Sequence, residues 1–220
     1  MPLLCLDLDG TLVDRDTAAN AWLRAFVIAR GGNEGLVHAA ITADGGGHRP
    51  KPEVRDDLTR LLDLTPDESA RIIEDLRAGI IEHLTLVPDA IEALARARTQ
   101  GWTLLIVTNG ATSQQQAKLA ATDLAAHVDG WVISEECGVA KPDPVIFTLA
   151  VEQVPGLTTD DLAGAWHIGD SAEADVQGAH SAGLRSIWLR RGRDYPEGVV
   201  APTAMADSFS EAVDIVLTSR

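Results

Sequence analysis

The strongest constraint on the fold is the alternation of short apolar segments with helical patterns along most of the chain. Segments of strand type lie at residues 3–8, 103–107, 131–134, 166–168 and 186–189. Apolar residues at helical spacing lie before, between and after the last four segments, at residues 89–101, 113–121, 144–153, 175–182 and 208–217. Strands that alternate with helices are typical of a parallel sheet covered on both faces. We therefore expect a three-layer, Rossmann-like α/β core.

The interval between the first two strand segments departs from this pattern. Residues 15–88 contain helical patterns at 17–30, 53–62 and 66–83, and none of strand type. This interval is too long for a crossover and too periodic for a disordered loop. We expect an α-helical cap domain at 15–88, inserted at the C-terminal edge of the sheet into a core formed by 1–14 and 89–220. The strongest loop signal of the chain, "DGGGHRPKP" at residues 44–52, lies within this insertion.

Composition excludes several classes of protein. A chain of 220 residues with 45% hydrophobic content can bury one core plus a smaller unit, which excludes disorder. No apolar run approaches the roughly 20 residues that a membrane-spanning helix needs. The net charge of −15 repels polyanions, so we expect neither nucleic acid nor a membrane as partner. Cys5 and Cys137 are expected to be reduced, and no secretory leader is visible, which predicts a cytoplasmic protein.

Two aspartates follow the first strand in "LLCLDLDGT", residues 3–11. Asp7 lies at the tip of the strand, and side chains alternate along an extended backbone, so Asp7 and Asp9 share a direction. Ligands of open α/β sheets bind outside the carboxyl ends of the strands. Two adjacent carboxylates repel unless a cation or a shared proton neutralises them. The pair therefore predicts a divalent metal, a shared proton or both, with an ordinary solvated turn as the alternative.

The next two strands also end in polar residues. "LLIVTNG" leaves Thr108, Asn109 and Gly110 at the tip of the second strand, where a hydroxyl and backbone N–H groups suit phosphoryl oxygens. Lys141 follows the third strand in "GVAKPDP", a loop that prolines stiffen. A helix cap and a solvated loop lysine would explain each feature separately. Their occurrence at neighbouring strand ends instead favours a common site.

The fourth strand ends in "WHIGDSAEADVQGA", with Asp170 at its tip and Asp175 five residues later, near the start of a helix. Acids are favoured at a helix start by the dipole, so Asp175 also has a purely structural explanation. Oxygen ligands from Asp7, Asp170 and a backbone carbonyl beside Asp9 would suit Mg²⁺. A hydroxyl and an ammonium group from the other strand ends would complete a cage for a tetrahedral anion.

The motifs "DLDGT", "VTNG", "GVAKPDP" and "IGDSAEADVQGA", in this order, resemble the four motifs of the haloacid dehalogenase (HAD) superfamily. The resemblance covers essentially the whole chain. It is to the phosphatase branch with a helical C1-type cap, and is phosphoglycolate phosphatase-like. It implies a magnesium-dependent phosphatase that hydrolyses a small phosphorylated metabolite through an aspartyl-phosphate intermediate.

The resemblance also implies roles for individual residues. Asp7 would be the nucleophile and Asp9 the general acid/base, an acid that the dehalogenating members lack. The residues that would bind the substrate phosphate are Thr108, Asn109, Gly110 and Lys141. The residues that would hold Mg²⁺ are Asp7, Asp9 and Asp170, with Asp175 in a supporting role.

The insertion is expected to select the substrate, because the core motifs handle only the phosphoryl group. Its loop "GGGHRPKP" carries His48, Arg49 and Lys51, and a bidentate Arg49 could hold a carboxylate or second phosphate of the substrate. A plain linker between helices is the alternative. Sugar phosphates, phosphoglycolate and nucleoside monophosphates all remain open as substrates, and the sequence does not indicate the oligomeric state.

Other functions are compatible with parts of this pattern. A phosphomutase would use the same core residues, and a carbon–phosphorus hydrolase would use Lys51 as Schiff-base former. A receiver-type signalling module takes its phosphoacceptor from the third strand, which here ends in Ser134, Glu135 and Glu136, and it has no long helical insertion. That alternative is disfavoured by motif order and size. A catalytically silent binding protein is disfavoured because no motif residue is missing.

Overall fold

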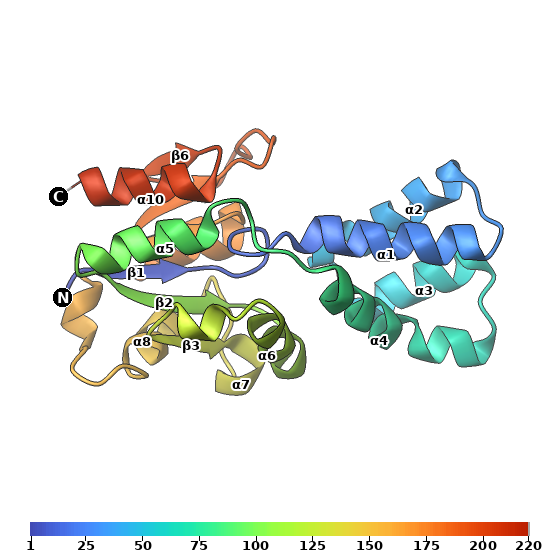
Figure 1. The fold of residues 1–220 in the computed structure, drawn as a ribbon, viewed down its shortest axis with the longest axis horizontal. Helices are drawn as coiled ribbons and strands as arrows, with labels where there is room; N and C mark the ends of the chain where they lie inside the picture. Colours follow the sequence, from blue (N-terminus) through green and yellow to red (C-terminus); the bar gives the residue numbers. More distant parts are fainter. Residues whose placement is uncertain (220) are drawn as a thin grey trace. The chain divides into compact units, whose positions relative to one another are not determined.

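The computed structural model describes residues 1–219, in two compact units (Figure 1). The core unit consists of Met1–Val13 together with Leu86–Arg220. The helical insertion consists of Asp14–Thr85. The chain therefore leaves the core unit once, directly after its first strand and the turn that follows, and re-enters it before the second strand.

The core unit contains a parallel sheet of six strands in the order β3-β2-β1-β4-β5-β6. The strands are β1 Leu3–Leu6, β2 Thr103–Thr108, β3 Gly130–Ile133, β4 Trp166–Gly169, β5 Arg185–Leu189 and β6 Ala204–Ala206. β1 is central, and its Leu4 pairs with Leu104 of β2 and with Trp166 of β4. The strand order reverses between β1 and β4, and such a switch point is where doubly wound sheets bind ligands at the carboxyl ends.

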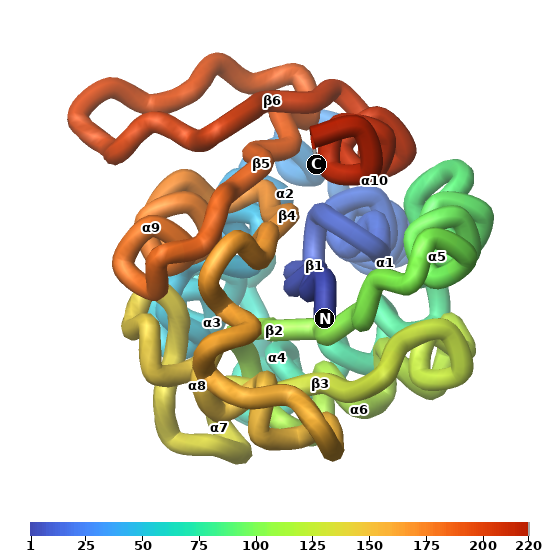
Figure 2. Tube along the Cα trace, turned by 90° about the vertical axis from the view of Figure 1, so that its left-hand side faces the viewer, coloured from blue at the N-terminus to red at the C-terminus, as the bar shows by residue number. Residues whose placement is uncertain are grey.

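Helices cover both faces of this sheet. Figure 2 shows α5 and α10 on one face and α8 and α9 on the other. The helices of the core unit are α5 Ala90–Thr99, α6 Thr112–Ala121, α7 Ser134–Cys137, α8 Val145–Val151, α9 Gly178–Ser181 and α10 Phe209–Thr218. Short 3₁₀ turns span Leu124–Ala126 and Thr159–Leu162, and a π-helical turn spans Ala172–Gln177. The predicted three-layer, Rossmann-like α/β core is confirmed.

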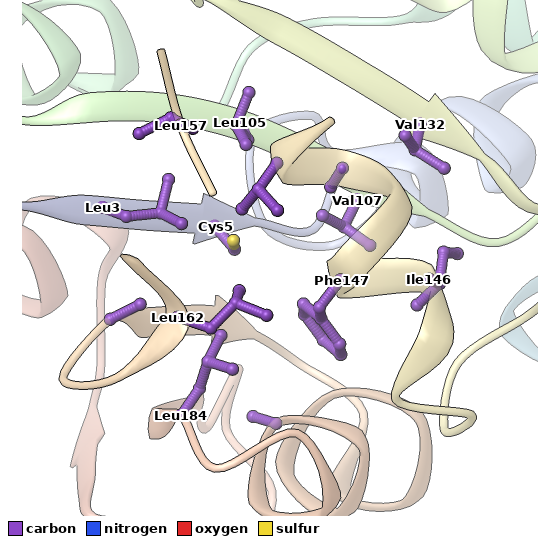
Figure 3. Packing of buried hydrophobic residues seen from close by; sticks show 14 residues of the cluster. Leu3, Cys5, Leu105, Val107, Val132, Ile146, Phe147, Leu157, Leu162 and Leu184 are labelled. Carbon is purple, nitrogen blue, oxygen red and sulfur yellow. The ribbon is translucent and has the colours of Figure 1, made fainter. Parts of the chain in front are cut away.

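The core on one face of the sheet fixes the strands that lead to the candidate site. Side chains of alternate strand residues point to the same face, so Leu3 and Cys5 of β1 join Leu105 and Val107 of β2. Phe147 of α8 packs against this layer, and all five residues are buried (Figure 3). Close packing of this kind leaves little freedom for the strands, so the residues after β1 and β2 start from fixed positions.

The helical insertion has a hydrophobic core of its own. Its helices are α1 Arg15–Ala29, α2 Glu34–Asp44, α3 Lys51–Leu62 and α4 Pro66–His83, with a 3₁₀ turn at Gly45–Gly47. The largest residues of its core include Leu23, Leu58, Ile72 and Leu76. α4 begins with a capping box, in which the Thr65 hydroxyl accepts from the Glu68 N–H and the Glu68 carboxylate accepts from the Thr65 N–H.

Several sequence-based bounds are corrected. β1 ends at Leu6 rather than at Leu8, because the carbonyl of Leu8 already accepts turn hydrogen bonds from Leu12 and Val13. The predicted loop at 44–52 is shorter, since α2 runs through Asp44 and α3 begins at Lys51. α2, α7 and β6 were not predicted.

The structure also bears on two further predictions, which concern membrane-spanning helices and the state of the two cysteines. Among residues 1–219, no helix has the length and apolar character needed to span a membrane. Cys5 and Cys137 are both free thiols, and burial raises the pKa of Cys5 to about 12. The Cys5 thiol is therefore an unreactive part of the core.

Candidate active site

Lys141 joins two carboxylates in the interior at the carboxyl end of β1. Its Nζ donates to Asp7 Oδ1 and to Asp175 Oδ1, each at 2.7 Å. Only 1% of the Lys141 side chain is exposed. Burial by itself would lower the pKa of Lys141, but the two carboxylates raise it above its ordinary value. Lys141 is therefore a fixed positive charge within this site.

Asp7 lies directly after β1, and its backbone N–H donates to the carbonyl of Ile168 in β4. Burial raises the pKa of Asp7 to about 8, with further increases from Asp175 and Asp170, while Lys141 opposes the rise. A carboxylate attacks only in its ionised form, so a further cation beside Asp7 would favour the reactive state.

Three buried acids converge at this point. One oxygen each from Asp7, Asp170 and Asp175 lie within 4.8 Å of one another. These residues come from the ends of β1 and β4 and from the π-helical turn Ala172–Gln177. Clustered carboxylates with a single buried lysine between two of them are a donor set that fits a hard divalent cation such as Mg²⁺.

Asp175 is held from several sides. Its Oδ2 accepts from the Ser171 N–H at 2.9 Å, and its Oδ1 lies 3.0 Å from Nε2 of the buried His167. Burial would raise the pKa of Asp175, but Lys141 and His167 hold it well below its usual value. A Cβ at Gly169 would lie 2.2 Å from the carboxyl carbon of Asp175, so the last residue of β4 has to be glycine.

Asp170 is fixed by β5 and the loop that follows it. Its backbone carbonyl accepts from Trp188 Nε1 at 2.8 Å and from the Arg193 guanidinium at 2.9 Å, and Arg193 also contacts Oδ2 at 2.9 Å. Gly10 of the first motif adopts a φ of +76°, and a Cβ there would lie 2.5 Å from Asp170 Oδ2. Both the turn and the close approach to Asp170 therefore require glycine at this position.

Asp9 has different partners from Asp7. Lys118 Nζ lies 2.7 Å from Asp9 Oδ1 and 2.5 Å from Asp9 Oδ2, and Gln115 Nε2 donates to Oδ2 at 3.1 Å. The Asp9 carboxylate thus belongs to this second cluster, whereas Asp7 belongs to the acidic triad. A metal contact from Asp9 would accordingly use the backbone carbonyl beside it, as the sequence suggested.

The three polar or glycine residues at the end of the second motif have different partners. Thr108 ends β2 and is buried, with its hydroxyl 2.7 Å from Gln115 Nε2. Asn109 exchanges two hydrogen bonds with the backbone of Lys141, both at 2.9 Å, and so fixes the loop that carries this lysine. The N–H of Gly110 donates to the hydroxyl of Ser134 at 3.0 Å. Contact of Asn109 and Gly110 with a phosphate stays a prediction.

The residues expected to select the substrate belong to the helical insertion. The Arg49 guanidinium lies 2.8 Å from Asp57 and donates to the Ala43 carbonyl at 2.8 Å, which ties the end of α2 to α3. Lys51 Nζ donates to the Gly47 carbonyl at 3.0 Å, and His48 is exposed. A role for these three side chains in substrate recognition stays a prediction.

Comparison with known proteins identifies the family. A family model described as haloacid dehalogenase-like hydrolase matches residues 1–183. The chain belongs to this family. The match includes all four HAD motifs and the whole insertion, and membership of a hydrolase family argues against a receiver-type signalling module.

Relatives of the HAD-like chain include named phosphatases. Pyrimidine 5'-nucleotidase YjjG of Escherichia coli (strain K12) is 37% identical over 145 residues, which are 66% of this chain and 62% of YjjG. A phosphoserine phosphatase of Thermus thermophilus is 39% identical over 107 residues, which are 49% of this chain and 41% of that enzyme. The matched segments therefore span less than two thirds of the length of either relative.

A solved structure supports the HAD fold over the full length. YfnB from Bacillus subtilis, described as a HAD-hydrolase bound to magnesium, superposes with a TM-score of 0.80 and covers 98% of each chain. Its sequence is 23% identical to this one, so the likeness concerns the fold alone.

Side chains outside the four HAD motifs also contribute to the site. Sequence reasoning missed Gln115, Lys118, His167 and Arg193. Gln115 and Lys118 had a detectable signal, because they share one face of a predicted helix with the apolar Leu119. For Arg193 the sequence offered no signal, since its contact with Asp170 depends on the path of a loop.

Proposed function

We propose that this chain is a phosphatase that hydrolyses a small phosphorylated metabolite through an aspartyl-phosphate on Asp7. The observation that carries the proposal is the buried Lys141 ammonium between Asp7 and Asp175, with Asp170 close by. This arrangement supports the proposal, because a carboxylate lies beside fixed positive charge, as phosphoryl transfer requires. The named activities of YjjG and the phosphoserine phosphatase, both on small phosphorylated compounds, support the substrate class.

The proposed reaction has two steps. The Asp7 carboxylate attacks phosphorus, and the bond to the leaving oxygen breaks while that oxygen takes a proton from Asp9. A water molecule then gives its proton to Asp9 and attacks the phosphorus, which releases phosphate and restores both aspartates. Lys141 and the Thr108 hydroxyl would bind phosphoryl oxygens in both steps.

Magnesium is part of the proposal. Asp7, Asp170 and Asp175 would hold the ion, with the backbone carbonyl beside Asp9 as a further ligand. The ion would neutralise the charge that otherwise makes nucleophile and phosphoryl group repel. The convergence of three buried acids within 4.8 Å of one another supports this assignment.

The test is a panel of phosphorylated metabolites assayed with purified protein and MgCl₂. We expect release of inorganic phosphate from at least one monoester, and loss of that release in EDTA. Analysis of the organic product separates a phosphatase from a phosphomutase or a carbon–phosphorus hydrolase. Release of no phosphate from any monoester, or full activity in metal-free protein, would contradict the proposal.

Substrate selection by the insertion is a separate part of the proposal. Arg49→Ala should raise KM or lower kcat/KM for the best substrate while barely changing turnover of a small aryl phosphate. Because Arg49 also binds Asp57, the variant must be checked for unfolding. Equal effects on both substrates would instead assign Arg49 to the stability of the insertion.

The remaining expectations concern the cellular location of the enzyme and its binding partners. A cytoplasmic location stays a prediction from the two free thiols. The excess of negative charge continues to disfavour nucleic acid as a partner.

A further inference from the structure

Helix α6 turns an unusual set of residues toward the interior. Gln115, Lys118 and Leu119 lie on one face at spacings of three and four residues, with exposures of 1%, 4% and 3%. A lysine is almost never buried unless its charge is paired, so Lys118 requires an explanation. Its partners are Asp9 of the first HAD motif and Gln115 of the same helix.

The Lys118 ammonium has three donors, and each has an acceptor. Two of the acceptors are the carboxylate oxygens of Asp9, and the third acceptor is Gln115 Oε1 at 2.8 Å. Asp9 itself follows the end of β1 in an irregular turn, and 29% of its side chain is exposed. Lys118 and Gln115 contact both carboxylate oxygens of Asp9, so these contacts restrict the orientation of its side chain.

Gln115 extends this cluster to Thr108. Because Lys118 can only donate, Gln115 presents Oε1 to Lys118 and Nε2 to the other side. Nε2 then donates to Thr108 Oγ1 at 2.7 Å and to Asp9 Oδ2 at 3.1 Å. Since the Thr108 oxygen accepts from Gln115, its own hydrogen points elsewhere. The Asn109 carbonyl, at 3.5 Å, is too distant to hold it, so the hydrogen can be donated to a substrate oxygen.

We propose that Lys118 and Gln115 are positioning residues, which hold the Asp9 carboxyl group and the Thr108 hydroxyl in the orientations that the reaction needs. The inference rests on the proposed function, because it assigns proton transfer to Asp9 and phosphoryl binding to Thr108. One buried lysine and one buried glutamine of α6 thus align groups from the ends of β1 and β2.

The proposal predicts an effect that depends on the leaving group. An alkoxide leaving group is strongly basic and needs a proton as it departs, so it depends on a well-placed Asp9. A p-nitrophenolate group departs without one. kcat/KM reports the steps up to and including the first phosphoryl transfer, so loss of Asp9 alignment should lower kcat/KM for alkyl monoesters much more than for p-nitrophenyl phosphate.

The experiment compares Lys118→Met with Lys118→Arg on both substrates. We expect Lys118→Met to lower kcat/KM for the best alkyl monoester by about 10²-fold, the lower range for general acid catalysis, with a small change for p-nitrophenyl phosphate. Lys118→Arg should recover part of the loss. In an Asp9→Asn background, Lys118→Met should cause little further loss, since Lys118 acts through Asp9.

Arg98→Met is the matched control. It also removes a cation from an ion pair in the core unit, but its partner Asp129 precedes β3, at the edge of the sheet away from the site. This variant should leave kcat/KM for both substrates unchanged. Equal losses on both substrates for Lys118→Met, or no loss on either, would overturn the proposal.

A second measurement tests the contact between Lys118 and Asp9 without any assay of activity. A double-mutant cycle of Asp9→Asn and Lys118→Met on thermal unfolding measures the coupling between the two side chains. Absence of coupling overturns the inference even if the wild-type protein hydrolyses a phosphate monoester. If the wild-type protein releases no phosphate although coupling is present, the proposed function fails and the contact stands. If Lys118→Met does not fold, Lys118→Arg serves both measurements, with a smaller leaving-group effect expected.

Discussion

The two aspartates of the first motif have separate lysine partners, and this separation suits two different tasks. Asp7 is buried with Lys141 among two further carboxylates, whereas Asp9 lies with Lys118 and Gln115. Environments that differ in this way allow one carboxyl group to act as nucleophile and its neighbour to handle protons. Two of the three lysines of the chain contact this pair of acids.

The roles of these aspartates can be tested by amide substitutions. Asp7→Asn should abolish phosphate release, because the amide oxygen is a poor nucleophile. Asp9→Asn should slow turnover of an alkyl monoester by about 10²–10⁴-fold while magnesium affinity, measured by calorimetry, stays close to that of the wild type. Near-normal turnover of Asp7→Asn would rule out the covalent mechanism.

The grouping of residues at strand ends was predictable, and the pairing of these residues with side chains of a helix was not. The structure brings together Asp7, Asp170, Asp175 and Lys141, which the sequence placed at one edge of a parallel sheet. That inference needs only the rule that carboxyl ends of parallel strands meet. The contact of Lys118 with Asp9 joins positions 109 residues apart, and helical periodicity gives no information about such a pairing.

At the scale of elements, periodicity predicted the central strands and the helices of ten or more residues except α2, and it failed for short or irregular elements. β6 has only three residues, Ala204–Ala206, too few to show a pattern. The predicted helix at 175–182 begins earlier, as the π-helical turn Ala172–Gln177, and Asp175 lies in the first turn of this element. A π-helical turn has no separate sequence period, and such turns are frequent at functional sites.

Helix α2 lies between two glycine-containing stretches and was not predicted. Its ends do carry capping signals. Asn33 accepts from the Leu36 N–H at the start, and Gly45 adopts the left-handed conformation with a φ of 59° at the end. Both residue types are favoured at these positions, so attention to caps would have predicted this helix.

The capping box of α4 gives a prediction for the stability of the insertion. Thr65→Ala removes the hydroxyl that accepts from the Glu68 N–H, and N-cap losses of this kind cost about 1 kcal/mol. We expect a lower midpoint in urea unfolding, with an unchanged m-value. Thr65→Ser, which keeps the hydroxyl, is the control. Equal stability of the alanine and serine variants would show that the cap contributes nothing.

The same capping box gives a pH dependence. The Arg30 guanidinium, followed by the Thr65 N–H and hydroxyl, lowers the pKa of Glu68 from 4.5 to about 2. A depressed folded-state pKa means that the contribution of Glu68 to stability is complete above pH 4.5 and is lost as the pH falls toward 2. Glu68→Gln should therefore flatten the loss of stability over this range more than Glu74→Gln, which removes a carboxylate from the same helix. Equal slopes for the two variants would contradict the assignment.

At the scale of the whole molecule, the net negative charge opposes the binding of the anionic substrate that we propose. A net charge of −15 disfavours the approach of an anionic phosphate ester. Lys118, Lys141 and Arg193 place local positive charge at the carboxyl ends of the sheet, and each contacts at least one of the site aspartates. Three carboxylates in one buried cluster still exceed what Lys141 and Arg193 can neutralise. A fully ionised cluster therefore needs an additional cation.

This need predicts that magnesium stabilises one unit of the molecule and not the other. The acids of the triad all belong to the core unit, and the helical insertion has a separate hydrophobic core. A ligand at about 100 times its Kd stabilises the folded state by about 2.7 kcal/mol. Magnesium should accordingly slow amide hydrogen exchange in β1 and β4 by up to about 10²-fold, while exchange in α4 stays the same. Asp170→Asn should remove the effect without any assay of activity. Unchanged exchange in β1 and β4 on addition of magnesium would show that the acidic triad does not bind the ion, and equal slowing in α4 would show that the two units unfold together.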